Sequence, residues 1–158
     1  MGATQTDLPL LQRREIEARI AAPLIRAFAA EVGQETALRV ARQVMASLAR
    51  EAGAGLRRAM GGDRLQDLAR GVLQWSRGGA LEMTVEEQTP RCFALRVTQC
   101  RFAQMYRELG LADLGYELSC ARDFSLVEGF NPRIRLERTH TLMEDADSCD
   151  FRFTCEDG

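Results

Sequence analysis

The chain has 158 residues, 46% of them hydrophobic and 28% charged, a balance typical of one globular domain spanning residues 1–158. The formal net charge is only −2, and the basic residues, all of them arginine, are spread along the chain, so we expect no nucleic-acid partner. No apolar run is long enough to cross a bilayer and no secretory signal is evident, so we expect a cytoplasmic protein without a membrane partner, its five cysteines present as thiols.

The first half of the chain predicts three helices. Apolar residues recur every three or four positions in residues 16–28, 38–48 and 65–75. Pro23 indicates a kink or a new start in the first helix, and Gly53 indicates the end of the second. Three helices therefore precede any strand.

The second half alternates between two hairpins and a helical pair. Apolar and polar residues alternate, as in strands, at 81–86, 93–97, 134–142 and 149–155, and helical spacing returns at 102–109 and 112–129. We therefore predict an α+β fold in which N-terminal helices precede two β-hairpins, with a helical pair between them. The hairpins should form a four-stranded antiparallel sheet covered by helices on one side.

A thiol and a carboxylate share one face of the second helix of that pair. Tyr116, Cys120, Asp123 and Val127 follow one another at spacings of four, three and four. Two interpretations stay open. Cys120 is a small buried hydrophobe beside a solvated Asp123, or the two groups belong to a site.

The final hairpin carries His140, the only histidine. Strict alternation places His140 on the inward face with Arg138, and a hairpin with a short loop brings Cys149 to within about 7 to 8 Å of it, measured between backbones. His140 is then either a core histidine bonded to a carbonyl or an acid, or a base beside a thiol. Arg138 either reaches the sheet edge or binds a carboxylate.

Zinc is a further alternative, because thiol, imidazole and carboxylate groups are all acceptable ligands. No C-x-x-C pair is present, so a structural zinc site is only weakly indicated, while a dispersed catalytic site stays open. The candidate ligands are Cys100, Cys120, Asp123, His140 and Cys149.

Several separated blocks resemble the L-2-amino-thiazoline-4-carboxylic acid hydrolase family across about residues 95–155. These blocks are residues 100–111, 119–123, 128–132, 138–143 and 149–153. One departure is Asp145, which stands where the family has a glycine and could alter the last hairpin loop. The element order is also similar to that of 4-vinyl-reductase-like and TRAPP-like α+β domains.

The resemblance implies a hydrolase that opens a small nitrogen-containing ring, cleaving a carbon–nitrogen bond in a cyclic amide or amidine with a thiolate or a metal-activated water. With the residue pattern, it indicates Cys120, Asp123, His140 and Cys149 as catalytic residues. It indicates Tyr116, Asn131 and Arg138 as substrate-binding residues, and Cys100, Cys120 and Cys149 as ligands if zinc is present. The alternative is a non-catalytic small-molecule sensor or partner-binding module, and a homo-oligomer is left open.

Overall fold

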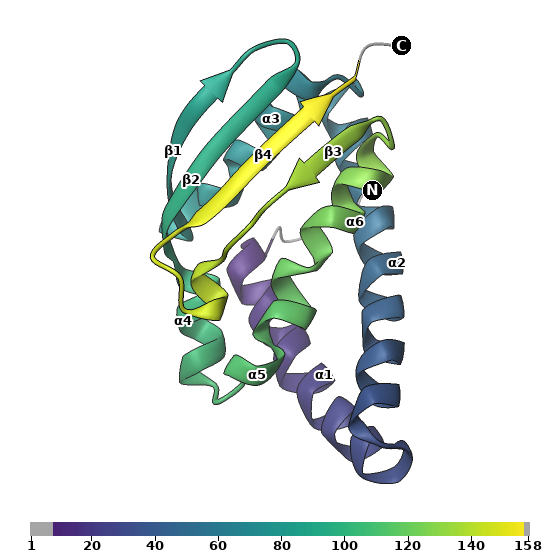
Figure 1. Cartoon of the computed structure of the whole chain (residues 1–158). Coiled ribbons are helices and arrows are strands. Elements are labelled where there is room, and N and C mark those ends of the chain that lie inside the picture. The colour runs from purple at the N-terminus through teal and green to yellow at the C-terminus, as the bar shows by residue number, and fades with distance from the viewer. Residues whose placement is uncertain (1–7, 157–158) are drawn as a thin grey trace, which may run out of the picture.

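Residues 8–156 are described by the computed structural model, and they form an antiparallel sheet with helices on one of its faces (Figure 1). The strand order is β1-β2-β4-β3. The strands are β1 (Leu81–Gln88), β2 (Cys92–Cys100), β3 (Ile134–Glu137) and β4 (Cys149–Cys155). The predicted α+β fold with a four-stranded antiparallel sheet is confirmed.

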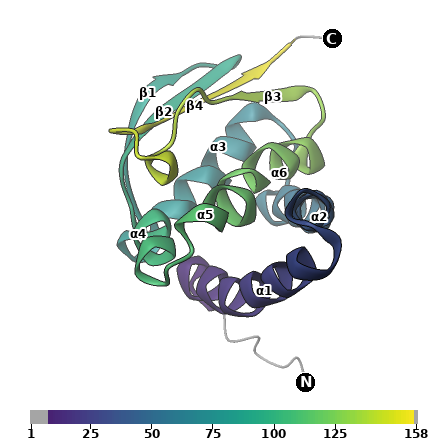
Figure 2. The same cartoon turned by 60° about the horizontal axis from the view of Figure 1, so that its bottom comes forward.

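The helices form two layers beneath the sheet. They are α1 (Leu10–Val32), α2 (Gln34–Met60), α3 (Leu65–Leu73), α4 (Arg101–Glu108), α5 (Ala112–Gly115) and α6 (Arg122–Phe130), with 3-10 turns at Gln74–Gly79 and Leu142–Glu144 and a π turn at Tyr116–Cys120. Figure 2 shows α3 and α6 under the sheet and α1 on the far side of them. No helix in residues 8–156 is long and apolar enough to cross a membrane.

Large apolar side chains fill the space between the sheet and the first helical layer. Phe93 and Phe153 project from neighbouring strands, and their rings stack with centroids 5.7 Å apart. Leu68 and Val72 of α3 pack against them, and all four side chains are almost completely buried. These contacts hold the sheet and α3 together as a rigid frame.

The new helix start predicted at Pro23 and the helix end predicted at Gly53 are wrong, while a kink at Pro23 stays a prediction. Helix α1 continues through Pro23 without a break, and α2 continues past Gly53 to Met60. Gly53 is a packing residue and not a cap, because a Cβ there would collide with the backbone of α6 at the Leu126 carbonyl. The missing side chain therefore lets two helices approach closely.

The apolar stripe predicted in α1 does not face the core. Ile16, Ile20, Leu24 and Phe28 are 51% to 61% exposed. The small residues on the inner side of α1, such as Ala18, are buried instead. A four-residue period identified the helix, but the choice of buried side depends on its neighbours in the fold.

The last hairpin is shorter than predicted. Strand β3 ends at Glu137, which pairs with Arg152, and the backbone then leaves the sheet. The amides of Thr139 and His140 donate to the carboxylate of Asp150, at N–O distances of 2.8 and 2.9 Å, and not to a strand backbone. Strand alternation therefore does not apply at His140.

Candidate active site

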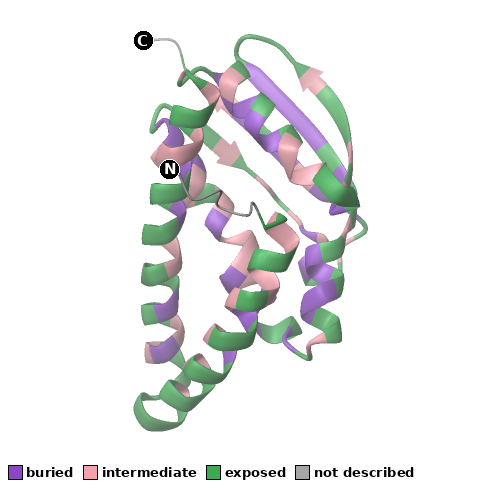
Figure 3. Cartoon of the chain, turned by 180° about the vertical axis from the view of Figure 1, so that it is seen from behind, coloured by how far each residue is buried: buried purple, intermediate pink, exposed green. Residues whose placement is uncertain are grey.

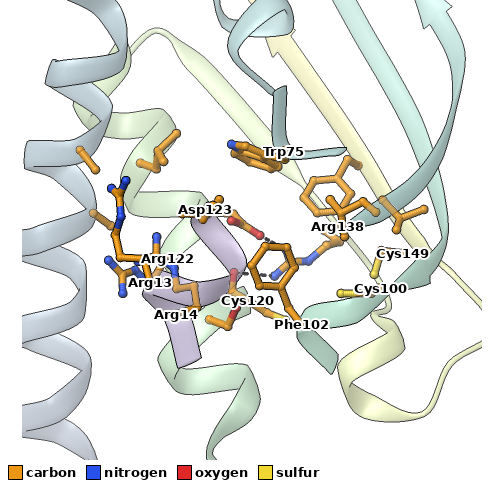
Figure 4. A pocket seen from close by; sticks show the side chains of 18 of the residues that line it. Arg13, Arg14, Trp75, Cys100, Phe102, Cys120, Arg122, Asp123, Arg138 and Cys149 are labelled. Carbon is orange, nitrogen blue, oxygen red and sulfur yellow. Dashed lines mark hydrogen bonds and ion pairs between the residues drawn. The ribbon is translucent and has the colours of Figure 1, made fainter. Parts of the chain in front are cut away.

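A cavity of about 210 Å³ lies between the inner face of the sheet and helices α1, α2 and α6 (Figure 4). At the roughly 30 Å³ that one water molecule occupies in the liquid, this volume would hold about seven waters. Pockets for drug-sized ligands usually span about 300 to 1,000 Å³. The cavity therefore suits a small molecule such as a single substituted ring.

Aromatic side chains form part of the cavity wall. Trp75, Phe102 and Phe151 line it, and the rings of Trp75 and Phe151 meet edge to face with centroids 6.2 Å apart. Phe151 and Phe102 are buried, so the walls are fixed by the same core that holds the sheet. A flat ring would find apolar surface here.

The carboxylate of Asp123 and the guanidinium of Arg138 form an ion pair in the middle of the cavity. Their Oδ2 and Nη1 atoms lie 2.6 Å apart, and a second nitrogen of Arg138 donates to the Cys120 carbonyl at 3.0 Å. Only 2% of the Arg138 side chain is exposed, and its guanidinium lies 5.0 Å from the Phe151 ring centroid. Arg138 therefore points into the protein, and the predicted alternative of a position at the sheet edge is wrong.

The carboxyl group of Asp123 is buried enough for its pKa to shift, and exposed enough for a ligand in the cavity to contact it. Burial raises the pKa of its carboxyl group, and the charge and hydrogen bond of Arg138 oppose this rise without cancelling it. Asp123 lines the cavity and keeps 22% of its side chain exposed. A carboxyl group in this setting can exchange protons with a bound ligand.

The thiols of Cys100, Cys120 and Cys149 also line the cavity. Cys120 is the last residue of the π turn, and this turn is closed by a 2.8 Å bond from the Ala121 amide to the Tyr116 carbonyl. Burial raises the pKa of all three thiols, and that of Cys149 to about 11. The three groups are therefore protonated near neutral pH.

Three further arginines line the cavity that the sequence patterns do not identify: Arg13, Arg14 and Arg122. Arg14 of α1 and Arg122 of α6 both line it, and both contact the carboxylate of Glu17, with shortest N–O distances of 2.8 Å. Arg122 directly precedes Asp123, which was the available signal. Arg14 was hidden because the exposed stripe of α1 had been taken as its apolar side. Sequence patterns thus indicate Asp123, the thiols and Arg138, but not the arginines on the other side of the cavity.

Three predicted site residues do not line the cavity. The imidazole of His140 lies beside Ser148 and Asp150, with Nε2 3.1 Å from the serine oxygen and Nδ1 3.2 Å from the carboxylate. Asn131 donates to the Asp63 carbonyl and accepts from the Arg133 amide, so it holds a turn. Their roles in binding or catalysis stay predictions.

The third is Tyr116, whose ring lies 5.8 Å from the Arg138 guanidinium carbon. It touches the site through that arginine and lies outside the cavity lining. Its predicted contact with substrate also stays a prediction.

The predicted zinc ligands do not form a cluster. Across residues 8–156, no group of three or more His, Cys, Asp or Glu side chains is arranged to hold a metal ion. The cavity is lined by the thiols of Cys100, Cys120 and Cys149, but they are not arranged as metal ligands. His140 lies outside the cavity because β3 ends early. The sequence-based ligand set is therefore not assembled.

The fold and the cavity define an α+β protein with a partly open cavity that both charged and apolar side chains line. The chain belongs to the L-2-amino-thiazoline-4-carboxylic acid hydrolase family, whose model matches residues 13–153. This match includes the helical first half, beyond the 95–155 region that carried the resemblance. The name of the family is that of a hydrolase.

A solved structure shares the fold. It is a trafficking protein particle complex subunit 3 from Naegleria fowleri, covalently bound to palmitic acid. The TM-score is 0.52 at 10% identity, and the similarity covers 92% of this chain and 96% of that one. At this identity the likeness concerns the fold alone, and it agrees with the predicted TRAPP-like element order. None of the curated proteins compared with the chain matches it.

Proposed function

We propose that the protein is a hydrolase that opens a small nitrogen-containing ring, a cyclic amide or amidine such as 2-aminothiazoline-4-carboxylate, inside the 210 Å³ cavity. The observation that carries the proposal is a buried carboxyl group, Asp123, placed among thiols in a small cavity of a chain belonging to this family. The cavity size matches one ring, and its aromatic walls match a planar group.

Ring opening needs a nucleophile at the amidine or amide carbon and a proton for the departing ring nitrogen. Asp123 is the acid or base of this proposal, because it lines the cavity whereas His140 does not. Water attacks the ring carbon as its proton passes to Asp123. In an amidine that proton moves on to the ring nitrogen. The carbon–nitrogen bond then breaks as the remaining hydroxyl proton passes through the same carboxyl group to the nitrogen, which leaves a carbonyl on the carbon and both protons of the water on the nitrogen.

A thiol route uses the same groups. Cys120 or Cys149 attacks the ring carbon as its proton passes to Asp123, the ring nitrogen leaves with that proton, and water then releases the product from sulfur. Both thiols are protonated in the free protein, so this route requires proton removal during attack. Arg138 holds the Asp123 carboxylate in place in either route.

The test is turnover of 2-aminothiazoline-4-carboxylate, followed by mass spectrometry of the ring and its opened product. Asp123→Asn should lower kcat by about 100-fold or more, the usual contribution of a positioned acid or base. Asp113→Asn, at an exposed carboxylate outside the cavity lining, is the matched control and should retain activity, while His140→Ala tests the predicted role of the histidine. Loss of turnover in His140→Ala but not in Asp123→Asn would show that the acid is misassigned.

Cysteine variants separate the two routes. Cys120→Ala or Cys149→Ala should abolish turnover in the thiol route and leave it largely intact in the water route. Each change should cost no more than about 1 to 3 kcal/mol of stability, because it removes one buried sulfur atom. A covalent adduct on intact protein would identify the attacking cysteine, and metal analysis of the active sample would test the zinc alternative.

Binding without turnover is the result that favours the alternative function. If the wild-type protein binds the ring but leaves it unchanged with and without added zinc, a small-molecule sensor or partner-binding module is the better description. The shared fold with a trafficking complex subunit is compatible with such a module.

A further inference from the structure

The side of the cavity opposite Cys100 and Cys149 is cationic (Figure 4). Arg14 and Arg122 are nearly buried there, with 14% and 8% of their side chains exposed. Both guanidinium groups contact one carboxylate, that of Glu17. Glu17 is thus the carboxylate that both guanidinium groups contact, and Asp123 acts on them from a greater distance.

Arg122 also has an unused donor. Its Nε is buried and is the one such side-chain nitrogen or oxygen without a hydrogen-bond partner in residues 8–156. Its Nη1 is occupied, at 2.8 Å from Glu17 and 3.8 Å from the Met45 sulfur. Buried guanidinium donors are normally satisfied, so an unpartnered one beside a cavity indicates a place for an acceptor.

The electrostatic setting agrees with this geometry. Burial lowers the pKa of Arg14, the neighbouring charge of Arg122 lowers it further, and the carboxylates of Glu17 and Asp123 only partly oppose this lowering. An anion between the two guanidinium groups would relieve their repulsion and accept from the free Nε. Planar, forked donors of this kind suit a carboxylate.

We infer that Arg14 and Arg122 form a subsite for the carboxylate of a small ring substrate, an inference that rests on the proposed function for the identity of the ring. With the carboxylate held there, the rest of a small ligand extends towards Asp123 and the thiols, which line the same cavity. The subsite would select ring acids over uncharged or decarboxylated rings.

The experiment compares the binding of 2-aminothiazoline-4-carboxylate and of 2-aminothiazoline by calorimetry. Arg122→Met should weaken the carboxylate at least tenfold and leave the decarboxylated ring unchanged. Glu17→Gln should tighten the carboxylate, because it removes the internal competitor for both arginines. Arg19→Met, an exposed arginine paired with Glu15, is the matched control and should bind as wild type does.

The outcomes keep the two proposals apart. If the wild type opens the ring while Arg122→Met and Glu17→Gln bind the carboxylate as wild type does, the subsite is wrong and the function stands. If neither the wild type nor a variant opens the ring, but Arg122→Met binds the carboxylate more weakly and Glu17→Gln binds it more tightly, the subsite stands and the function is wrong. If a thermal melt shows that Arg122→Met does not fold, the Glu17→Gln variant decides. Tighter binding of the carboxylate supports the subsite, and unchanged binding overturns it.

A second inference rests on an independent feature, the outer surface of α1 and α2. Eight of the twelve large hydrophobic residues exposed in residues 8–156 lie on these two helices. They recur every fourth residue, and we call them the apolar face: Ile16, Ile20, Leu24, Phe28, Val32, Val40, Val44 and Leu48. Figure 3 shows long exposed tracts along both helices.

The area of the apolar face fits one half of a stable dimer. Its side chains are between 45% and 61% exposed. At about 100 Å² each they leave roughly 800 Å² uncovered, which is one partner's share of a standard interface. Several charged groups on these helices are paired within the chain, for example Arg19 with Glu15 and Arg42 with Glu117, and such pairs reduce the repulsion between two copies.

We infer that the apolar face docks on the same face of a second copy of this chain. A ridge of residues four apart on each helix packs into the matching groove of its partner, with a crossing angle of about −50°. A two-fold axis places each ridge against its own counterpart and closes the assembly at two copies.

Sedimentation over a range of protein concentrations tests this inference. Wild type should be a dimer, and Phe28→Glu should weaken the dimer at least tenfold, because the two-fold axis places two buried charges in the interface. Val85→Glu, a similarly exposed apolar position on β1, is the control and should remain dimeric. A wild-type monomer at every concentration, or a dimer unaffected by both Phe28→Glu and Leu24→Glu, would overturn it.

Discussion

The protein has two buried regions that differ in the kind of side chain they contain. Between the sheet and α3, large apolar side chains such as Phe153 and Leu68 are fully buried against one another. Around the cavity, charged groups such as Arg138 and Arg122 are nearly as buried. The first interior can only stabilise the fold, whereas the second holds charges at a cost that a bound ligand can offset.

The largest expected effect comes from removing a side chain of the apolar interior. Phe153→Ala should lower the free energy of unfolding by about 3 to 5 kcal/mol, since it deletes a fully buried ring stacked on Phe93. Urea denaturation measures the loss. Val85→Ala, at a partly exposed position, should cost less than about 1 kcal/mol, and equal losses in the two variants would contradict this view of the core.

The charged interior should respond to pH in a way the apolar one does not. Arg138→Met leaves the Asp123 carboxylate without its partner and should cost about 3 kcal/mol at neutral pH. Without Arg138, the pKa of the Asp123 carboxyl group in the folded protein would rise further above the pKa of the same group in the unfolded chain. Stability lost by the variant should therefore grow as the pH rises above about 4 and shrink below it.

Unfolding free energies of wild type and Arg138→Met at pH 4 and pH 7 provide the measurement. The double variant with Asp123→Asn is the control, because it has no carboxylate to titrate and its loss should not depend on pH in this range. A pH-independent deficit in Arg138→Met alone would mean that Asp123 keeps other partners.

The cavity thiols should make the fold sensitive to alkali. Their pKa values are raised in the folded protein, so above about pH 9 the unfolded chain loses protons that the folded protein retains. Stability then falls as pH rises, by at most about 1.4 kcal/mol per pH unit for each thiol. Cys149→Ala should show a shallower fall between pH 9 and pH 11, and an unchanged slope would show that Cys149 titrates normally.

The smallest effect is expected in the loop that departs from the family pattern. Asp145 is the one non-glycine residue in residues 8–156 with a positive φ, 65°, and its carboxylate accepts from Arg107 at 2.9 Å. Asp145→Gly relieves the backbone strain and gives up an exposed ion pair of little worth. We expect the free energy of unfolding to increase by less than about 1 kcal/mol. A clear decrease would show that the ion pair stabilises the protein by more than the backbone strain costs.

Sequence patterns predicted those parts of the molecule in which local periodicity and burial agree. The alternation at Leu81 to Val97 gave the first hairpin, and helical spacing placed Cys120 and Asp123 together at what is now the cavity. The spacing of apolar residues in α1 predicts the helix but assigns the wrong side of it to the core. Small residues such as Ala18, which are buried, give no strong hydrophobic signal.

The site itself was only half predictable. His140 was placed by extending strand alternation past Glu137, where side-chain bonds to Asp150 replace the strand pairing. Arg122 was missed because a buried arginine is rare and shows no period. Long-range contacts decide the burial of both side chains, and the only local signal for Arg122 is that it directly precedes Asp123.

The π turn at Tyr116–Cys120 has a further consequence for how such a site can originate. A π turn uses one residue more than an α turn for the same hydrogen-bonded loop, so the step between a regular helix and this one is a single codon. Removing that codon would rotate everything before it by about 100° relative to Asp123. Cys120, the last residue of the turn, would keep its three-residue spacing from Asp123, whereas Tyr116 and α5 would turn to a new side of the helix. A single inserted or deleted residue in this segment would therefore change which side chains lie beside the thiol and the carboxyl group.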